Sequence, residues 1–338
     1  MKISIGAKII DGPWGGGNLF FKNLQKYLSD KGHTVVFDLL SKDIDIILLT
    51  DPRFLSESSS FDYLDLKIYK KFINPKVKIL HRINECDERK GTQYINRLLR
   101  RGNYVADHTV FIASWLRDLK IWRREGESSV ILNGGNTDLF HSKNPSEWNE
   151  IFPIRLVTHH WGGNRLKGAD IYEMIDAMLV HPSWKGKVEF TYIGNVPKGC
   201  QLQNSRVIAP MAGEKLAEEL ARHHVYVTGS INEPAGMHHI EGALCGLPLL
   251  YRNSGALPEY CTGFGLQFQG LTDFEQTLKK MISEYNQWSL ALRHYPHTAD
   301  RMCAEYLRLF EAMHKRRDEI VGQRKIWREP WVVIRNQI

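Results

Sequence analysis

NEPAGMHHIEGALCGLPLLYRNSGALPEY, residues 232–260, carries two glutamates on either side of a turn and the start of a short helix. Glu233 and Glu241 are separated by seven residues, and small residues dominate the helix that begins between them. Gly246 and Pro248 end that helix, and LPLLY follows as a short apolar strand. A helix followed at once by a strand of this kind is typical of a parallel sheet with helices on its faces.

The same stretch suits a ligand that has both phosphate and hydroxyl groups. A helix N-terminus offers unpaired N–H groups and a partial positive charge, which favour a phosphate. Ionised carboxylates such as Glu233 and Glu241 only accept hydrogen bonds, so they suit hydroxyl donors. A nucleotide sugar combines both groups. The structural alternative makes Glu233 a loop acid and Glu241 a first-turn acid favoured by the helix dipole, and spacing alone does not separate the two interpretations.

Short apolar, β-branched runs alternate with helical patterns along the whole chain, which predicts α/β architecture with parallel sheets covered on both faces. The predicted strands are ISIGA, TVVFDLL, DIIL, VKILHRI, HTVFIA and SVIL in the first half, and IRLVTHH, KVEFTYIG, RVIA, VYVTGS, LPLLY and GLQF in the second. The predicted helices are Gly17–Lys31, Tyr94–Arg101, Trp115–Arg124, Ala169–Val180, Gly213–His223 and Phe274–Tyr285.

The polar, proline-containing stretch HSKNPSEWNEIFP at 141–153 is the best linker, with about six strands on each side. We therefore expect two Rossmann-like, doubly wound domains, 1–142 and 143–315. They would face each other, with ligands bound in the cleft at the carboxyl ends of the strands. The basic, aromatic tail 316–338 is expected to pack back on the first domain.

Composition restricts the partners and the compartment. The 338 residues include 45 Lys and Arg against 38 Asp and Glu, a net charge of +7 that allows nucleic acid, acidic membrane or a phosphorylated substrate as partner. Five cysteines without a C-x-x-C pair favour a reducing compartment over disulfides or zinc. No apolar run approaches a membrane span and no secretory segment follows Met1, so we expect a soluble, cytoplasmic protein.

The loop GPWGGGNLFFKNL at 12–24 joins the first strand to an amphipathic helix. Its glycines let the backbone approach a ligand closely. Asp38 lies about twenty residues on, where a dinucleotide-binding unit keeps an acid for the ribose. However, Phe20 occupies the position of the third glycine in G-x-G-x-x-G, which disfavours dinucleotide binding.

A second turn, in HHWGGNRLKGADIYEMIDAM at 159–178, follows a strand and leads into a helix. Arg165 and Lys167 lie in this turn, where cations can neutralise a diphosphate leaving group. The alternative is a pair of solvated loop cations. Their place at a strand's carboxyl end favours the functional interpretation.

Three side chains at the end of the fourth strand, in HRINECDERKG, are candidates for contact with an acceptor: His81, Asn84 and Asp87. A lone histidine at a strand end is more often a hydrogen-bonded structural residue, and this is the leading interpretation of His81.

Paired histidines suggest a metal site only superficially. His159 and His160 are neighbours on a predicted strand and so point to opposite faces, and adjacent helical residues such as His238 and His239 also diverge. Asp43-Ile44-Asp45 opens an apolar strand and is interpreted as a strand N-terminus. We expect no metal site.

Two segments interleave aromatic and basic residues: SWLRDLKIWRREG at 114–126 and LKIYKKF at 66–72. The first interpretation is an amphipathic helix with its apolar residues in the core. The functional alternative is an interfacial patch that docks on acidic lipid or holds an anionic acceptor.

Over nearly its whole length the chain resembles the retaining glycosyltransferases of family 4, which have the GT-B fold. The resemblance rests on residues 232–260 and on SVILNGGNTDLF at 129–140, which is similar to the family's inter-domain V-I-x-N-G-x-D segment. It implies that the C-terminal domain holds a nucleotide-sugar donor and the N-terminal domain an acceptor. By position, Glu233 contacts sugar hydroxyls, Glu241 contacts the ribose and Lys167 contacts the diphosphate. The backbone of Gly236, Met237 and His238 contacts the sugar and phosphate. Gly16 and Gly17 lie near the phosphate from across the cleft.

The chain departs from the family pattern at three positions. Gly162 stands where the family has an arginine five residues before the phosphate-binding lysine, and Arg165 is the candidate to replace it. Asn136 replaces the aspartate of N-G-x-D, and Asn84 lies nearest to the expected N-domain histidine.

The expected activity is retaining transfer of a sugar from a nucleotide-diphosphate sugar to a hydroxyl of a glycan, lipid or small molecule. Positioning and stabilisation of the departing diphosphate would carry the reaction, without metal or cofactor. Whether the donor is a UDP- or a GDP-sugar stays open, and so does peripheral contact with an acidic membrane; no nucleic acid partner is expected. The alternatives are a nucleotide-sugar epimerase, an inverting transferase or a non-catalytic sugar-nucleotide-binding protein.

Overall fold

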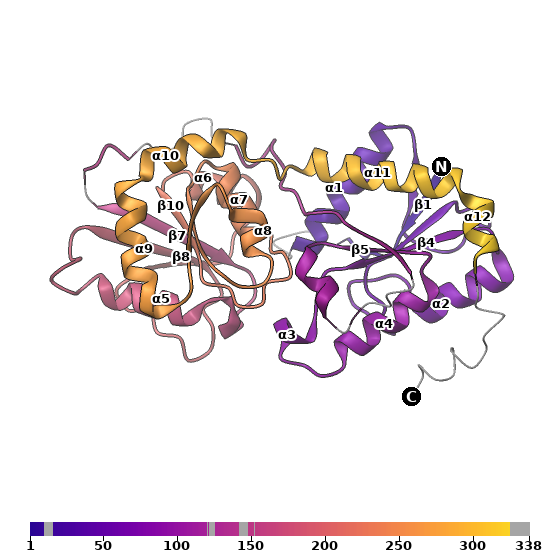
Figure 1. Cartoon of the computed structure of the whole chain (residues 1–338), viewed down its shortest axis with the longest axis horizontal. Coiled ribbons are helices and arrows are strands. Elements are labelled where there is room, and N and C mark those ends of the chain that lie inside the picture. The colour runs from indigo at the N-terminus through magenta and orange to yellow at the C-terminus, as the bar shows by residue number, and fades with distance from the viewer. Residues whose placement is uncertain (10–15, 120, 122–125, 142–147, 152, 325–338) are drawn as a thin grey trace. The chain divides into compact units, whose positions relative to one another are not determined.

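The structure is a computed structural model that describes residues 1–9, 16–119, 121, 126–141, 148–151 and 153–324. The chain divides into two compact units, drawn in Figure 1. The first contains Met1–Ile10, Gly17–Leu132 and Asp300–Ile338, and the second contains Asp11–Gly16 and Asn133–Ala299. Each unit is built on a sheet of six parallel strands, so the predicted fold class is confirmed.

The first unit has the strand order β2-β1-β3-β4-β5-β6, and its strands coincide with the apolar runs predicted for the first half of the chain. The strands are β1 Lys2–Ile5, β2 Thr34–Val36, β3 Ile46–Leu49, β4 Lys78–Ile83, β5 His108–Phe111 and β6 Glu127–Val130. The helices are α1 Gly16–Asp30, α2 Tyr63–Ile68, α3 Asp87–Lys90, α4 Ile95–Val105, α11 Ala299–Lys315 and α12 Arg317–Gly322, with the π-helix η1 Tyr69–Ile73 and the 3-10 helix η2 Ser114–Asp118.

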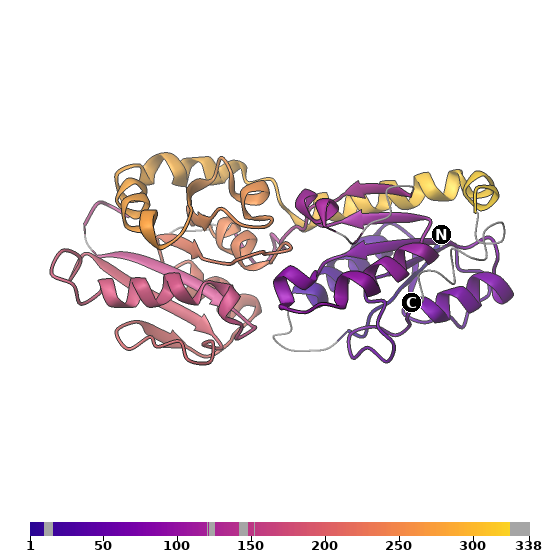
Figure 2. The same ribbon diagram turned by 60° about the horizontal axis from the view of Figure 1, so that its bottom comes forward.

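Helices cover both faces of this sheet, which explains why its strands are apolar along their whole length. Successive strand side chains point to opposite faces. Accordingly Ile46 and Leu48 pack with the inner faces of α1 and α11, whereas Ile47 and Leu49 pack with α2 and its neighbours. Figure 2 shows the yellow α11 on one side of the sheet and the purple helices on the other.

The predicted helix Trp115–Arg124 is wrong over the part that the structure describes. Ser114–Asp118 forms a 3-10 turn, and the backbone is extended at Leu119; residues 120 and 122–125 lie outside the described ranges. Leu116 and Ile121 are both fully buried. In a continuous α-helix two residues five apart lie about 140° from each other, so a helix could not bury both.

Lys78, at the start of β4, is a buried cation. It is 0% exposed, and its Nζ makes no hydrogen bond to any residue within the described ranges. Burial lowers the pKa of Lys78 to about 8; Asp45 and Asp107 raise it, and Arg317 and Arg324 lower it further. A buried charge of this kind opposes folding.

We expect Lys78→Met to raise the free energy of unfolding at pH 7 by about 1 kcal/mol or more, a Tm increase of roughly 2–4 °C. The pKa of Lys78 in the folded chain lies below that of an unfolded lysine, about 10.4. The unfolded chain therefore binds the proton more tightly, and wild-type stability rises with pH between about 8 and 10. Thermal melts of both proteins from pH 7 to 10 should show the advantage of the variant shrinking in that window. A constant difference would contradict this account.

The C-terminal part of the chain completes the first unit. Met302, Tyr306 and Phe310 of α11 belong to the same hydrophobic cluster as α1. Beyond it, Arg324 donates to both carboxylate oxygens of Asp107, at 2.8 and 2.7 Å, and Arg316 lies 2.9 Å from Glu127. Residues 325–338 of the predicted tail lie outside the described ranges.

The boundaries between the units differ from the predicted 142/143 and 315/316. The chain enters the second unit at Asn133, whose backbone N–H donates to the Tyr260 hydroxyl at 2.6 Å and whose side-chain amide donates to the Ala235 carbonyl at 2.9 Å. It leaves the unit at Ala299, so all of α11 after that residue belongs to the first unit. Of the predicted linker, residues 142–147 and 152 lie outside the described ranges.

The second unit has the strand order β12-β11-β10-β7-β8-β9, and its strands again match the predicted runs. The strands are β7 Ile154–His160, β8 Val188–Gly194, β9 Arg206–Ile208, β10 Val225–Thr228, β11 Leu249–Arg252 and β12 Gly265–Phe268. The helices are α5 Ala169–Met178, α6 Gly213–Leu220, α7 His238–Leu244, α8 Leu257–Cys261, α9 Leu271–Ser283 and α10 Tyr285–Ala291, with the 3-10 helices η3 Arg165–Lys167 and η4 Leu292–His294.

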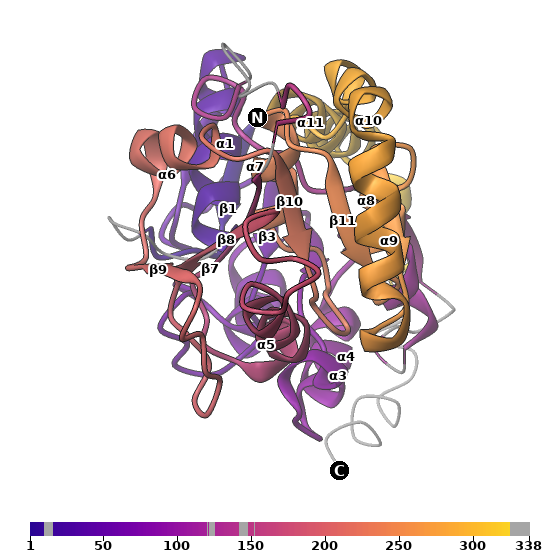
Figure 3. The same cartoon turned by 90° about the vertical axis from the view of Figure 1, so that its left-hand side faces the viewer.

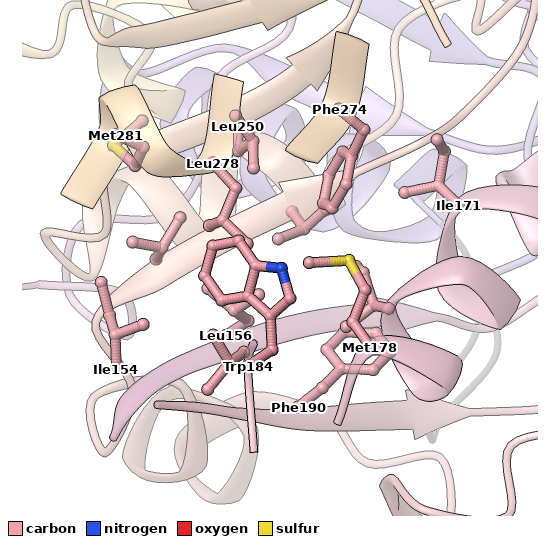
Figure 4. Close-up of a cluster of buried hydrophobic side chains, with 14 of the residues drawn as sticks. Ile154, Leu156, Ile171, Met178, Trp184, Phe190, Leu250, Phe274, Leu278 and Met281 are labelled. Carbon is pink, nitrogen blue, oxygen red and sulfur yellow. The ribbon is translucent and has the colours of Figure 1, made fainter. Parts of the chain in front are cut away.

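One hydrophobic cluster holds α5 and α9 against the same face of this sheet. Figure 4 shows Ile171 and Met178 of α5, Phe274 and Leu278 of α9, and the intervening Trp184 around this cluster. The opposite face receives α7, and Figure 3 shows α7 beside β10. The central strands β7 and β10 are therefore covered on both sides, and their side chains point alternately toward α5 and α7.

None of the helices in the described ranges is long and apolar enough to cross a bilayer. All five cysteines are unpaired.

Candidate functional site

The second sheet has a topological switch point between its neighbouring strands β7 and β10. From β7 the chain proceeds outward to β8 and β9, and it then returns to the other side of β7 to form β10, β11 and β12. The loops that follow β7 and β10 therefore leave in opposite directions from neighbouring strands. In open α/β sheets ligands bind outside the carboxyl ends of the strands at such a switch point. The loop that contains Lys167 follows β7, and the loop that contains Glu233 follows β10.

Two glycines let these loops touch. Gly168 has φ +103°, and a Cβ built on it would lie 2.5 Å from the carbonyl carbon of Gly229. Next to this contact, the backbone N–H of Ile231 donates to the carbonyl of Leu166 at 2.8 Å. The backbone alone thus fixes the distance between the two loops.

This contact brings Lys167 and Glu233 together, although they are 66 residues apart in the sequence. Lys167 Nζ lies 3.2 Å from Glu233 Oε2. The Glu233 side chain is 5% exposed and that of Lys167 is 20% exposed, so the carboxylate is buried and the ammonium lies nearer to solvent. The pair presents one acceptor and one cation at the switch point.

The backbone around Glu233 is tightly constrained. Asn232 has φ +50°, which is uncommon for a residue other than glycine, and its N–H donates to the Ser254 hydroxyl at 2.8 Å. A Cβ on Gly255 would lie 2.5 Å from both the nitrogen and the oxygen of Glu233, and the N–H of Ala256 donates to the same carbonyl at 2.8 Å. Strained backbone that its surroundings hold in place is typical of functional sites.

Glu241 lies one turn into α7 and contacts a histidine from β7. His159 Nε2 is 2.7 Å from Glu241 Oε2, and the other ring nitrogen of His159 is 3.1 Å from the Tyr226 hydroxyl. Glu241 is 4% exposed. The structure therefore places Glu241 near the switch point as a histidine partner, and the predicted contact with ribose stays a prediction.

The N-terminus of α7 is formed by Met237 and His238, both predicted donor contacts. Met237 is the N-cap residue, and its side chain makes no capping hydrogen bond. His238 Nε2 lies 2.9 Å from Thr228 Oγ1. Burial, followed by the neighbouring His239, holds the pKa of His238 well below its usual value, so its ring is neutral. A Cβ on Gly236 would contact the His238 ring and would lie 3.1 Å from Glu233 Oε1, so only glycine fits between them.

His160 points to the opposite face from His159, as strand alternation predicts. Its Nε2 lies 2.7 Å from the Tyr172 hydroxyl of α5, and Thr158 bonds to that hydroxyl at 3.1 Å. The backbone N–H of Gly229 donates to the same hydroxyl at 3.3 Å. Tyr172 thus supports the loop contact at Gly168. The sequence did not identify it, because a tyrosine on the inner face of a helix looks like any core residue.

Arg165 points away from the pair formed by Lys167 and Glu233. Its guanidinium lies 3.0 Å from Glu173 on α5, and its side chain is 52% exposed. A Cβ on Gly162 would meet no atom of the described residues within 4 Å. The proposed replacement of the family arginine by Arg165 therefore requires this side chain to leave Glu173, and it stays a prediction.

The candidate residues of the predicted N-terminal domain are dispersed. Gly16 and Gly17 begin α1, and the preceding residues 10–15 lie outside the described ranges. Asn84 follows β4 and is partly exposed. The Asp87 carboxylate accepts from the backbone N–H groups of Ile95 at 2.9 Å and Asn96 at 3.0 Å, where α4 begins. Burial raises its pKa, but the hydrogen bonds from the Thr92 hydroxyl and these N–H groups together lower it.

His81 has a structural role. It is 0% exposed, its Nδ1 lies 2.6 Å from the side-chain oxygen of Asn103, and Gly102 packs against its ring. Burial lowers its pKa to about 4, so the ring is neutral. The structure supports the leading interpretation of His81 and argues against its contact with an acceptor.

A polar cluster at the carboxyl ends of β3 and β4 was not identified from the sequence. Arg53 donates to Glu85, its Nε lies 3.2 Å from Asp51, and Lys90 lies 3.3 Å from the other oxygen of Glu85. The carboxylates are largely buried, whereas Arg53 is 37% exposed. The sequence could have indicated this cluster, because DPR at 51–53 and INE at 83–85 lie at the ends of predicted strands. We add these charged side chains to the acceptor-side candidates.

Comparison with known proteins gives one weak relative in sequence. No protein-family model matches the chain. The chain is 24% identical over 212 residues to the phosphatidylinositol N-acetylglucosaminyltransferase gpi3 subunit of Schizosaccharomyces pombe. The match covers 58% of this chain and 45% of that protein, so the chain spans a little under half of the relative's length.

Solved structures of similar shape cover nearly the whole chain. Sucrose-phosphate synthase from Thermosynechococcus elongatus has a TM-score of 0.64 at 15% identity, covering 92% of this chain and 98% of its own. The catalytic domain of starch synthase IV from Arabidopsis thaliana, bound to ADP and acarbose, has a TM-score of 0.67 at 13% identity, covering 93% and 99%. Anabaena HepE in complex with UDP-glucose has a TM-score of 0.61 at 16% identity, covering 91% and 100%. The chain therefore has the GT-B fold.

Proposed function

We propose that this chain is a glycosyltransferase that moves a sugar from a nucleotide-diphosphate sugar to a hydroxyl of an acceptor, with retention at the anomeric carbon. The observation that carries the proposal is the 3.2 Å pair of Lys167 and Glu233 at the switch point of the second sheet. The weak relative is by name an N-acetylglucosaminyltransferase subunit, and structures of the same fold were solved with UDP-glucose and with ADP.

In the proposed reaction the acceptor oxygen attacks the anomeric carbon from the face that the diphosphate leaves, and the acceptor proton passes to the departing phosphate. This route needs no protein nucleophile, metal or cofactor. Negative charge grows on the leaving oxygen, and Lys167, with its ammonium near solvent, can stabilise it. Glu233, as a buried acceptor, can orient a sugar hydroxyl, and the N-terminus of α7 can receive the phosphate.

A thermal-shift screen of UDP, GDP and ADP tests donor binding. A nucleotide at 100 times its dissociation constant stabilises the folded chain by about 2.7 kcal/mol, which predicts a Tm increase of roughly 5–10 °C for the preferred base. Lys167→Ala should lose most of that shift, whereas Lys185→Ala, an exposed lysine of the same unit, should keep it. No shift with any nucleotide would contradict the proposal.

The second candidate is a GT-B protein that binds a sugar nucleotide but carries out other chemistry or none. The pairing of Arg165 with Glu173, and the open space at Gly162 where family 4 has an arginine, favour this alternative. Incubation with UDP- and GDP-sugars separates the cases. Slow donor hydrolysis and a product of unchanged anomeric configuration support retaining transfer. An inverted anomer, a C-epimer or no turnover identifies the alternatives.

A further inference from the structure

A row of apolar side chains on the first unit is exposed to solvent. Leu64 and Ile68 of α2 and Phe72 and Ile73 of η1 are 39%, 55%, 70% and 42% exposed. Leu64, Ile68 and Phe72 are spaced four residues apart and lie on one side of the continuous helix. The π-turn, closed by the bond from Asn74 N to Tyr69 O at 2.9 Å, adds Ile73 beside Phe72. Contiguous exposed apolar rows on a folded protein mark interaction sites.

The segments that carry and neighbour this row are rich in positive charge. Segments 63–76 and 95–105 contain seven Lys and Arg residues against one acid, Asp65. Two of the cations serve the fold, because Lys70 donates to the Val105 carbonyl at 2.8 Å and Lys76 lies 3.8 Å from Asp318. The other cations of these segments are Lys67, Lys71, Arg97, Arg100 and Arg101.

The two lysines nearest to the row lie along aromatic rings. Lys67 Nζ is 5.3 Å from the centroid of Tyr63, and Lys71 Nζ is 4.8 Å from that of Phe72. At a lipid interface, the methylene chain of a lysine packs on apolar surface while its ammonium group stays in the polar region. Burial, and next the charge of Arg101 on the neighbouring α4, lower the pKa of Lys67. An anion placed over Lys67 and Arg101 would relieve this repulsion.

We propose that the basic-apolar face, formed by Leu64, Ile68, Phe72 and Ile73 with Lys67, Lys71 and Arg101, docks on the surface of an anionic membrane. The apolar row enters the boundary between headgroups and acyl chains, and the cations contact lipid phosphates. A soluble polyanion such as nucleic acid would use the cations but would leave Ile68 and Phe72 exposed. Joined to the proposed function, and resting on it, docking brings the protein to acceptors carried by lipids.

Sedimentation with vesicles of phosphatidylcholine, with and without phosphatidylglycerol, tests the docking. We expect the full chain to bind the anionic vesicles and to be released by salt. Ile68→Ser/Phe72→Ser should weaken binding at least ~10-fold through lost apolar burial. Lys67→Gln/Lys71→Gln should weaken it roughly 30-fold through lost charge.

Matched controls lie on the second unit. Leu290 is 57% exposed, and Lys185 and Lys187 are exposed, so Leu290→Ser and Lys185→Gln/Lys187→Gln repeat the same chemistry away from the face. Both should bind vesicles like the wild type. Ile68, Lys71 and Phe72 are exposed and Lys67 is half-buried, so the face variants should stay folded. Their nucleotide-induced Tm shifts should match that of the wild type, which separates failure of docking from failure of the proposed function.

Three results would overturn the docking proposal. One is wild-type protein that stays in the supernatant with anionic vesicles at low salt. Another is retention of heparin without retention of vesicles, which would indicate a polyanion partner. The third is a dimer in analytical ultracentrifugation that Ile68→Ser/Phe72→Ser converts to monomer, which would identify a second copy of this chain as the occupant of the face.

Discussion

Lys167→Ala and Glu233→Gln are each expected to lower kcat for sugar transfer at least ~100-fold, the scale of removing one preorganised charge or hydrogen-bonding group from a transition state. The two side chains form a single pair 3.2 Å apart, so the double variant should lose little more than either single variant. Steady-state kinetics of the singles and the double would measure both effects.

The matched control for this pair is Glu173→Gln. Glu173 lies on α5 and pairs with Arg165 at 3.0 Å, and its side chain is 32% exposed. It should retain kcat within a few-fold. If Glu233→Gln is as active as Glu173→Gln while the melts of both resemble the wild type, the assigned site is wrong.

Gly168→Ala is expected to reduce both stability and activity. At φ +103° an L side chain is strained, and its Cβ would lie 2.5 Å from the backbone of Gly229, where no flexible side chain can yield. We expect a loss of roughly 2–4 kcal/mol in the free energy of unfolding, measured by urea denaturation. The loops should separate, which removes the alignment of Lys167 with Glu233 and lowers kcat even in the folded fraction.

Gly186→Ala is the control that isolates the strain. Gly186 has φ +76° in the same unit, and within the part of the chain that the structure describes a Cβ on it would meet no atom within 4 Å. Gly186→Ala should have the conformational strain without the steric clash. We expect it to lose about 1 kcal/mol in the free energy of unfolding and to keep a normal kcat. Equal losses in the two variants would mean that the close approach of Gly168 to Gly229 is unimportant.

The strands could be predicted from the sequence because both sheets are covered on both faces. Ile46–Leu49 is buried at every position, so it appears as a continuous apolar run that needs no knowledge of its neighbours. The 3-10 turn at Ser114–Asp118 could not be predicted, because Trp and cations at helical spacing look the same whether the helix forms or the chain bends to bury Ile121. Nor was α11, a regular amphipathic helix, among the predicted elements.

The candidate site was predictable in part for a related reason. Strand ends mark where functional loops lie, so Lys167 after β7 and Glu233 after β10 could be proposed from position and from the family resemblance. Strand alternation also separated His159 from His160. The pairing of His159 with Glu241 was beyond the sequence, because it depends on how α7 is rotated against β7. The exposed pair of Arg165 and Glu173 could not be predicted either, because it depends on the path of the loop that follows β7.

The first unit is assembled from both ends of the polypeptide, and this dictates an order of folding during synthesis. Until the ribosome has produced Met302, Tyr306 and Phe310, the side of the first sheet that carries Leu80 and Val110 has α1 but lacks the cover that α11 provides. Nearly all of the second unit, 133–299, has by then been made and can close around its own core. The nascent N-terminal third therefore exposes part of its hydrophobic core until α11 is synthesised. We expect chaperones to bind this surface, and we expect this part to aggregate first if translation is truncated.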